Sequence, residues 1–387
     1  MRKNFIPYGR QSISDDDIQA VADVLRDDFL TQGPMIEKFE TAYAKRHGAN
    51  YACAVSSATA ALHLTYQALG LGEGDVLWTC PNTFVATSNA ALYLGADVDF
   101  VDQDENIFCM SADALEAKLI LADKEDQLPK IVVPVHLGGL SPDMKNIRKL
   151  ANVYGFKIVE DASHAVGADY DGKPVGACPY SDACVFSFHP VKIITTGEGG
   201  LITTNDSDVY DHVMMARTHG ITKDPAKMVS DNPDPWTLEQ HFLGFNYRMT
   251  DIQAALGLSQ LEHLDENIVR RRTIAKRYRE ELKKLPIQCQ VKIEDGESSH
   301  HLFPVMFKDG ETRRQMFDYL RDHNIGTQIH YIPVHTQPYY QSLGFPMEYC
   351  PNAEDYYSRC LSLPMFHSLS DEDQGYIIDT MKGFFNE

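Results

Sequence analysis

Short apolar runs alternate with helical segments through the first half of the chain. The runs YACAV, VLWT, VDFV, IVVPV, KIVE and VFSF lie between residues 51 and 188, and each has the composition of a buried strand. Between several of them the apolar side chains recur at helical spacing, as in residues 58–69 and 143–154. Short buried strands that alternate with helices are typical of a mostly parallel sheet with helices on both faces. The pattern therefore predicts an α/β fold for this part of the chain.

Two helices are predicted before the first of these strands. Ser14 is a favourable N-cap, and the acidic residues after it suit the first turn of a helix over residues 15–28. Pro34 and Gly48 mark the ends of a second helix over residues 34–47, because proline fits a first turn and glycine often follows a last turn. The apolar residues that recur at helical spacing in the first helix are Ile18, Val21 and Leu25.

The pattern changes after Thr250, where the earlier alternation of strands and helices ends. Residues 251–285 are predicted to form a long helical stretch in which two helices meet near Leu264. The further elements predicted are the strands HLFPVMF and GTQIHYI and helices over residues 312–323 and 370–385. A chain of 387 residues also exceeds the usual size of one domain, about 50–250 residues. We therefore predict a large domain over residues 1–260, with a mostly parallel covered sheet, and a smaller C-terminal α+β domain over residues 261–387.

Composition and charge argue against several classes of protein. The formal net charge of −20 argues against nucleic acid or a membrane surface as a partner, since both favour basic patches. The first ten residues lack the apolar segment of a signal peptide, and no stretch of about 18 apolar residues predicts a membrane span. The eight cysteines include no C-x-x-C pair, so we expect reduced thiols and no metal site. These features predict a cytoplasmic enzyme.

Residues suited to catalysis follow the predicted strands. Open α/β sheets bind ligands at the carboxyl ends of their strands, so ligand-binding residues are expected just after each apolar run. The turn SSAT, residues 56–59, opens a helix and could offer backbone N–H groups to an anion. Phe84, in PNTFVAT, could stack on a flat ring, and Asp161, in EDASHA, could pair with a protonated pyridine nitrogen. In VFSFHPVKIITTGEGG, Lys192 could form a Schiff base and Ser187 could supply a hydroxyl group to a phosphate.

Each of these residues also has an ordinary structural explanation. The turn could be a simple N-cap, Phe84 a core side chain, Asp161 a surface acid and Lys192 a solvated charge. Lys192 is unusual because no other charged residue lies between Ser187 and Glu198, which does not fit a solvated face. The order of these features along the chain also favours a functional site over a structural explanation. A phosphate-type turn, an aromatic ring, an aspartate and a lysine each follow a strand, as a site for pyridoxal phosphate (PLP) requires.

The sequence resembles the DegT/DnrJ/EryC1/StrS family of sugar-nucleotide aminotransferases over nearly its whole length. The resemblance rests on LTQGP, SSATAALHL, PNTFVAT, PVHLGG, EDASHA and HYIPVHTQPYY, and with the highest specificity on SFHPVKIITTGEGG and GFNYRMTDIQAALG. It implies a type I PLP-dependent transferase with the fold of aspartate aminotransferase. It also implies that an amino group moves from L-glutamate to a nucleotide-linked keto sugar.

The resemblance further implies roles for individual residues. Lys192 matches the lysine that binds PLP covalently and later moves protons, and Asp161 matches the partner of its pyridine nitrogen. Asn246 matches a residue that reaches the cofactor phosphate from a second subunit, which implies a homodimer with a shared active site. The other cofactor contacts implied are Ala58, Thr59 and Ser187 at the phosphate, Phe84 on the ring and His164 near the phenolic oxygen. The substrate contacts implied are Tyr8, Phe29, Leu30, Thr31, Ser187, Asn246, Gln328, His330 and Tyr331.

Finer marks indicate the acceptor sugar. FIPYGRQSIS, THGITKDP and IHYIPVHTQPYY resemble members that aminate a UDP-linked 4-keto-6-deoxy-N-acetylhexosamine in pseudaminic acid biosynthesis. Another nucleotide-linked 4-keto-6-deoxy sugar, of the bacillosamine, legionaminic acid or perosamine type, is the alternative acceptor. A PLP-dependent sugar dehydratase is the alternative reaction, although such members carry histidine where this chain has Lys192. A protein of this fold with a regulatory or scaffolding role is the third reading.

The acidic net charge requires a local source of positive charge, because the cofactor and the nucleotide are both anions. The candidate cations are Arg10, Lys192, Arg248 and the run 270–272. We interpret that run as a solvated helix face.

Overall fold

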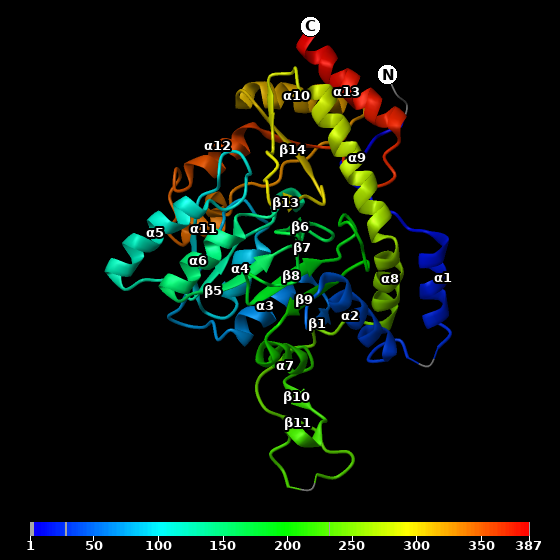
Figure 1. Cartoon of the computed structure of the whole chain (residues 1–387), viewed down its shortest axis with the longest axis vertical. Coiled ribbons are helices and arrows are strands. Elements are labelled where there is room, and N and C mark those ends of the chain that lie inside the picture. Colours follow the sequence, from blue (N-terminus) through cyan, green and yellow to red (C-terminus); the bar gives the residue numbers. More distant parts are fainter. Residues whose placement is uncertain (1–3, 28, 232, 387) are drawn as a thin grey trace.

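A seven-stranded sheet forms the centre of the computed structural model, which describes residues 4–27, 29–231 and 233–386 (Figure 1). From edge to edge its strands are β1 (Tyr51–Val55), β9 (Gly200–Thr204), β8 (Ala183–Ser187), β5 (Lys157–Asp161), β4 (Ile131–Val133), β2 (Val76–Thr79) and β3 (Asp97–Phe100). Strand β9 runs antiparallel to both neighbours, and the other strands all point the same way. The mostly parallel α/β sheet that the sequence predicts is confirmed, but the sequence analysis misses β9, a short strand that begins at the last glycine of GEGG.

Helices cover both faces of this sheet. One face carries α3 (Ala58–Ala68), α4 (Ala86–Leu92) and α7 (Ser207–Ala216), and the other carries α2 (Pro34–His47), α5 (Ala112–Glu125), α6 (Met144–Tyr154) and α8 (Asp251–Glu262). Alternate side chains of a strand point to opposite faces. In β1, Cys53 and Val55 belong to the first core, and Ala52 and Ala54 belong to the second. Both sets are buried, as expected for a sheet that is covered twice.

A three-stranded antiparallel sheet organises the C-terminal part of the chain. It consists of β12 (Ile287–Cys289), β14 (Phe303–Phe307) and β15 (Cys360–Leu363), and it shares an apolar core with α9 (Leu264–Leu282), α10 (Gly310–Asp322) and α13 (Asp371–Asn386). Helices α8 and α9 meet at His263, next to the predicted junction at Leu264. Ile6 joins this core because the N-terminal segment pairs with Ile325. The domain boundary at residue 260 stays a prediction.

The remaining elements are short or peripheral. They are α1 (Asp15–Val24), whose predicted end at Asp28 lies outside the described residues, α11 (Pro338–Ser342), α12 (Pro351–Arg359), the small sheet of β13 (Gly296–Glu297), β6 (Asp169–Tyr170) and β7 (Lys173–Pro174), and the pair β10 (Ile221–Thr222) and β11 (Glu239–Gln240). The segment that contains β10 and β11 extends away from the body of the molecule (Figure 1).

Helix α1 buries Asp17 and Val24, and not the face that its helical spacing predicts. Ser14 caps the helix as predicted, and its hydroxyl oxygen accepts a hydrogen bond from the Asp17 N–H. Ile18 and Leu25, however, are 59% and 57% exposed, so their helical spacing does not mark a buried face. Asp17 is buried instead, because its carboxylate accepts hydrogen bonds from two side chains of α8.

The predicted strand GTQIHYI does not form. Within it only Gln328 makes a β-bridge, to Ser362. Side-chain partners take the place of a ladder: His330 Nδ1 lies 2.9 Å from Ser362 Oγ, and the Tyr331 N–H donates to Asn82 Oδ1 at 2.9 Å. The prediction was wrong because these tertiary hydrogen bonds outweigh the local preference of the segment for a strand.

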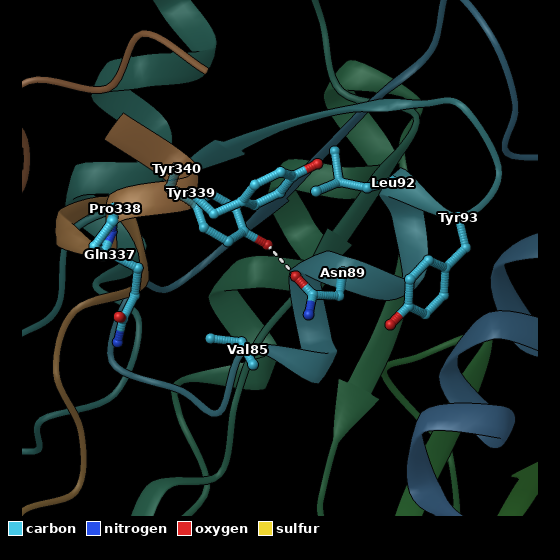
Figure 2. A pocket seen from close by; sticks show the side chains of 8 residues that line it. All are labelled: Val85, Asn89, Leu92, Tyr93, Gln337, Pro338, Tyr339 and Tyr340. Carbon is cyan, nitrogen blue, oxygen red and sulfur yellow. Dashed lines mark hydrogen bonds between the residues drawn. The ribbon is translucent and has the colours of Figure 1, made fainter. Parts of the chain in front are cut away.

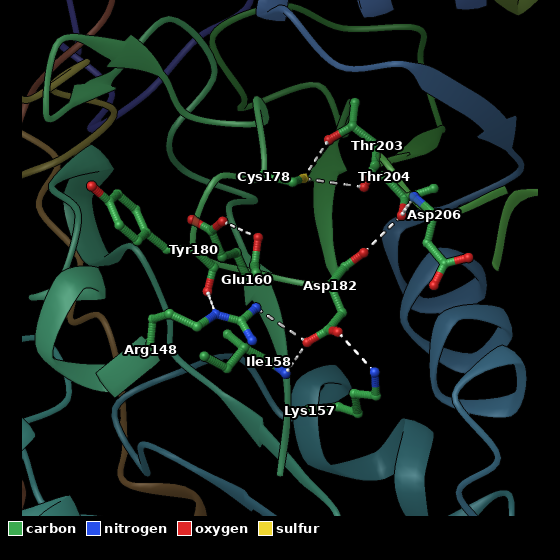
Figure 3. Close-up of polar contacts among 11 residues, drawn as sticks. Arg148, Lys157, Ile158, Glu160, Cys178, Tyr180, Asp182, Thr203, Thr204 and Asp206 are labelled. Atoms are coloured by element: carbon green, nitrogen blue, oxygen red, sulfur yellow. Dashed lines mark hydrogen bonds and ion pairs between the residues drawn. The ribbon is translucent and has the colours of Figure 1, made fainter. Parts of the chain in front are cut away.

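Asp182 fixes the register of β5 against β8 (Figure 3). Its carboxylate accepts a hydrogen bond from the Ile158 N–H at 2.8 Å and forms an ion pair with Lys157. Both contacts lie at the amino ends of the two strands. The same strands carry Asp161 and Ser187 at their carboxyl ends, and the register places Asp161 opposite Val185, two residues before Ser187.

The described part of the chain contains no helix with the length and apolar character that a membrane span needs. In the same residues, no group of three or more histidine, cysteine, aspartate or glutamate side chains is placed to hold a metal ion.

Candidate active site

A cavity of about 670 Å³ opens at the carboxyl ends of β1, β2, β4, β5 and β8. Turns and helix starts after these strands supply much of its wall, and residues 328–332 close it from the C-terminal part. Because the strands are parallel, their carboxyl ends meet at one edge and bring distant segments together. The predicted site residues that line the cavity are Tyr8, Ala58, Thr59, Phe84, Asp161, His164, Ser187, Lys192, Gln328, His330 and Tyr331.

Lys192 lies in the turn after β8, where its side chain is half-buried and lines the cavity. Burial lowers the pKa of Lys192 to about 8, and the negative charge of Asp161 opposes this effect. A lysine with this pKa is partly neutral near pH 7. The neutral amine is the nucleophile that forms a Schiff base, so Lys192 is chemically suited to that reaction.

Asp161 lies at the end of β5, and both of its carboxylate oxygens accept hydrogen bonds. The Thr87 hydroxyl donates to one oxygen at 2.7 Å, and the Ser163 hydroxyl donates to the other at 2.6 Å. The sequence analysis misses Thr87, although it lies in PNTFVAT, one turn after Phe84. A buried carboxylate in a fixed orientation is well suited to accept a hydrogen bond from a protonated ring nitrogen.

The start of α3 forms a turn suited to an anion. Ser57 caps the helix by accepting a hydrogen bond from the Ala60 N–H, and Ala58 and Thr59 line the cavity beside it. The positive end of the helix dipole and its free N–H groups favour an anion there. Gly200 of β9 packs against this turn: a Cβ at that position would lie 2.4 Å from the Ser57 carbonyl group and 2.5 Å from the Ala58 nitrogen. Glycine is therefore required for β9 to approach the turn.

Three buried histidines beside the cavity are neutral. The Gly138 N–H donates to His164 Nδ1 at 3.3 Å, so the neutral ring carries its proton on Nε2, which lies 3.0 Å from the Tyr331 hydroxyl. Burial lowers the pKa of His164 and of His301 well below the usual range, and lowers that of His330 to about 3. The sequence analysis misses His301, whose ring centroid lies 4.5 Å from that of His164.

These groups fit pyridoxal phosphate. The start of α3 and the hydroxyl of Ser187 suit a phosphate group. Ser187 lies near the start of α3 because it pairs with Gly200 of β9, which packs against that turn. Asp161 suits the ring nitrogen, and Lys192 suits the aldehyde. Phe84 is 60% exposed at the cavity, and its ring centroid lies 6.4 Å from that of Tyr331, so a flat ring could cover it.

Four predicted site residues lie outside the cavity of their own chain. Phe29 and Leu30 are 55% and 47% exposed, and Thr31 and Asn246 are also exposed. These residues belong to two segments that are neighbours, because Thr31 pairs with Thr250. The structure therefore brings the two segments close to each other but not into the cavity.

The arginines considered as local cations, Arg10, Arg248 and the run 270–272, do not line the cavity. Arg271 is instead buried and donates hydrogen bonds to main-chain carbonyl groups, while its two neighbours form ion pairs with aspartates. The run is therefore not a solvated helix face, because it ties α9 to the segments around it. Among the described residues that line the cavity, Lys192 is the only lysine or arginine.

Comparison with known proteins identifies the family. The sequence profile of the DegT/DnrJ/EryC1/StrS aminotransferase family matches residues 11–382. The chain belongs to this family. Spore coat polysaccharide biosynthesis protein SpsC of Bacillus subtilis is 39% identical over 98% of this chain and 97% of its own length. The UDP-4-amino-4,6-dideoxy-N-acetyl-β-L-altrosamine transaminase of Campylobacter jejuni is 38% identical over 97% of this chain and 96% of its own length.

Solved structures of aminotransferases have the same fold. Helicobacter pylori PseC, an aminotransferase involved in the biosynthesis of pseudoaminic acid, has a TM-score of 0.90 at 31% identity and covers 99% of this chain and 100% of its own. Spr1654 of Streptococcus pneumoniae, in its PLP form, has a TM-score of 0.88 at 29% identity and covers 99% of each chain. The chain is therefore a PLP-dependent sugar aminotransferase with the type I transferase fold, as the sequence predicts.

Proposed function

We propose that the chain transfers the amino group of L-glutamate to C4 of a UDP-linked 4-keto-6-deoxy-N-acetylhexosamine. The product would be UDP-4-amino-4,6-dideoxy-N-acetyl-β-L-altrosamine, in pseudaminic acid biosynthesis. The 38% identity to the Campylobacter jejuni transaminase and the likeness to Helicobacter pylori PseC support this acceptor. The observation that carries the amino transfer is Lys192, a lysine of lowered pKa in one cavity with Asp161. The cytoplasmic location stays a prediction.

Lys192 is the proposed catalytic residue of both half-reactions. When bound, PLP supplies the electron sink that stabilises the charge left on a carbon that loses its proton. The Lys192 amine takes the α-proton of L-glutamate, and it later returns a proton to C4 of the sugar. A base with a pKa of about 8 accepts and releases protons readily near neutral pH. Because a single residue delivers the proton to C4, its side of the sugar decides the configuration there.

Asp161 and its neighbours are proposed to hold the cofactor ring in its reactive state. The Asp161 carboxylate keeps the ring nitrogen protonated, and the hydroxyls of Thr87 and Ser163 fix the carboxylate in place. His164 is neutral, so it adds no positive charge that would lower the pKa of Lys192 further.

A second subunit is proposed to complete the site. Asn246 is exposed and lies outside the cavity of its own chain. The same holds for Phe29, Leu30 and Thr31, the substrate contacts implied by the family resemblance at the LTQGP motif. A homodimer in which these segments reach the cavity of the other subunit accounts for both facts. In that arrangement Asn246 binds the cofactor phosphate of the partner, and Phe29, Leu30 and Thr31 contact its substrate.

The alternative acceptors are other nucleotide-linked 4-keto-6-deoxy sugars. The identity to SpsC, a spore coat polysaccharide protein, supports keeping them. A dehydratase is not favoured. Such enzymes carry histidine at the position where this chain has Lys192, and the named relatives are transaminases.

The test is a paired assay of the PLP-loaded protein with L-glutamate. Separate reactions receive the β-L-arabino and the D-xylo epimers of the UDP-linked 4-keto-6-deoxy-N-acetylhexosamine, and mass spectrometry follows the conversion of ketone to amine. Amine formed mainly from the β-L-arabino epimer is the expected result. Amine formed mainly from the D-xylo epimer would assign the protein to a bacillosamine-type or legionaminic-type pathway. Amine from neither epimer would refute the UDP-linked acceptor.

A further inference from the structure

A second pocket, of about 440 Å³, lies beside the active-site cavity between α4 and α11 (Figure 2). One wall is a single face of α4 and its ends, where Val85, Asn89 and Tyr93 recur at helical spacing. The other wall is the segment 337–340 at the start of α11. No catalytic or cofactor role proposed above involves these side chains, although they belong to the motifs around PNTFVAT and HYIPVHTQPYY.

The pocket adjoins the active-site cavity, because Val85 and Gln337 line both. Two chain segments run from the cavity to the pocket, so that residues 89–93 and 338–340 lie just beyond residues that face the cofactor site. A ligand that reacts beside Lys192 and is longer than the cavity can therefore extend into the pocket.

Aromatic rings and amides equip the pocket for a flat, polar and uncharged group. Tyr93 and Tyr339 are 60% and 58% exposed, so their rings are accessible to a ligand. The Tyr340 hydroxyl donates to Asn89 Oδ1 at 2.7 Å, which leaves the two N–H donors of that amide for a ligand. Gln337 adds a second amide, with one acceptor and one donor side. No charged side chain of the described residues lines the pocket.

A hydrogen-bond chain holds the Asn89 amide in this orientation. Tyr340 has one hydroxyl proton, which it donates to Asn89, so the contact of 2.6 Å with Ser88 Oγ is one that Ser88 donates. Burial raises the pKa of Tyr340 to about 12, so its hydroxyl keeps this proton at neutral pH. The Asn89 donors are therefore directed before any ligand binds.

We propose that this pocket binds the pyrimidine base of the nucleotide-linked sugar. The inference rests on the proposed function, because only a nucleotide-linked acceptor brings a base to this cavity. Uracil presents acceptor, donor and acceptor along its hydrogen-bonding edge. The acceptor and donor of Gln337 and the directed donors of Asn89 can satisfy that edge, while Tyr93 and Tyr339 pack against the faces of the ring. A pocket without charged side chains suits the neutral base rather than the diphosphate.

The test is the binding of UDP to the PLP-loaded protein, measured by isothermal titration calorimetry. Asn89→Asp replaces the amide donors by an oxygen that repels the carbonyl groups of the base, and Tyr339→Ala removes an exposed ring. We expect each change to raise the Kd of UDP about tenfold, as the loss of a stacking or hydrogen-bonding contact to a base does. We also expect the wild type to bind UDP more tightly than ADP.

Asn152→Asp is the matched control. Asn152 is an exposed asparagine of α6, so the same chemical change occurs outside the pocket and should leave the Kd of UDP unchanged. The change in cofactor absorbance on addition of L-glutamate is measured for every variant. It reports whether the cofactor site itself is intact.

The outcomes separate the pocket from the proposed function. A wild-type Kd of UDP in both pocket variants would overturn the base site. If the same variants then changed the molar mass measured by light scattering, the pocket would belong to a contact between copies of the chain. A wild type that reacts with L-glutamate but does not bind UDP would overturn the base site and the UDP-linked acceptor together. UDP binding that weakens in the variants, with no amine formed from either keto sugar, would support the base site and overturn only the acceptor.

Discussion

The lowered pKa of Lys192 predicts how the uptake of PLP by the cofactor-free protein depends on pH. A lysine in water has a pKa of about 10.4, so about one side chain in 2,500 is neutral at pH 7. Burial lowers the pKa of Lys192 to about 8, which makes about one side chain in ten neutral at pH 7. Only the neutral amine attacks the aldehyde, so uptake at pH 7 should be about 250-fold faster than with an exposed lysine of equal reactivity.

The sign of the dependence follows from the same shift. The rate of uptake should rise with pH, reach half of its plateau near a pH of about 8, and then level off, because the amine is fully neutral above its pKa. Asp161 stabilises the ammonium form and so raises the pKa of Lys192 against the effect of burial. Asp161→Asn should therefore move the midpoint below a pH of about 8, even though the variant is expected to lose amino transfer.

Stopped-flow absorbance of the cofactor-free protein, mixed with excess PLP over a range of pH, measures this profile. Lys192→Ala is the control, since it should show no covalent attachment at any pH. A wild-type midpoint near the value of an exposed lysine would refute the effect of burial. A midpoint that rises in Asp161→Asn would refute the electrostatic role given to the carboxylate.

Three further changes test the packing around the site. Thr87→Val removes the hydroxyl bonded to the carboxylate at the end of β5 and should lower kcat about ten- to hundredfold, because a hydrogen bond to a charged group contributes about 1.5–3 kcal/mol. Thr87→Ser should restore most of the rate in steady-state kinetics, and equal rates in all three proteins would contradict the role. Gly200→Ala would place a Cβ 2.4 Å from main-chain atoms of the α3 turn, so it should weaken PLP retention in dialysis and lower the Tm. Gly72→Ala is the control: its added Cβ would have no atom within 4 Å, so neither PLP retention nor the Tm should change. Arg217→Met leaves the buried Glu40 carboxylate without its ion pair and should lower the free energy of unfolding in urea by about 3 kcal/mol. Adding Glu40→Gln should recover much of that loss, and no recovery would argue against the ion pair as its cause.

The sequence predicts the large sheet and much of the cavity because both depend on short-range patterns. Asp161 and Lys192 each follow a buried apolar run, and the parallel direction of the strands then brings their ends to one edge. Strand β9 shows where this reasoning stops. Its place between β1 and β8 depends on Gly200, whose missing Cβ lets the strand approach the start of α3. The local sequence around Gly200 does not indicate that the start of α3 is its contact.

Long-range contacts also explain the predictions that failed. Helical spacing shows that Ile18 and Leu25 share a face of α1, but it does not show which surface covers that face, and the structure leaves both exposed. The segment GTQIHYI has the composition of a strand, yet Asn82 and Ser362 take its polar groups. Thr87 donates a hydrogen bond to the carboxylate of Asp161, 74 residues away, and no local sequence pattern predicts this contact.

The net charge of −20 poses an electrostatic problem that the cavity solves with few cations. Lys192 is the only lysine or arginine among the described residues that line it, and Asp161 and Glu198 add negative charge. The buried histidines of the cavity are neutral, so a phosphate there depends on the N–H groups at the start of α3, on the positive end of its dipole and on the Ser187 hydroxyl. Further cations would bind an anion more tightly, but they would also lower the pKa of Lys192 below about 8. The amine would then be a weaker base toward the carbon acids that it is proposed to deprotonate. Partial charges at a helix start hold the anion with a weaker effect on that amine, which is a physical reason for a cavity so poor in cations.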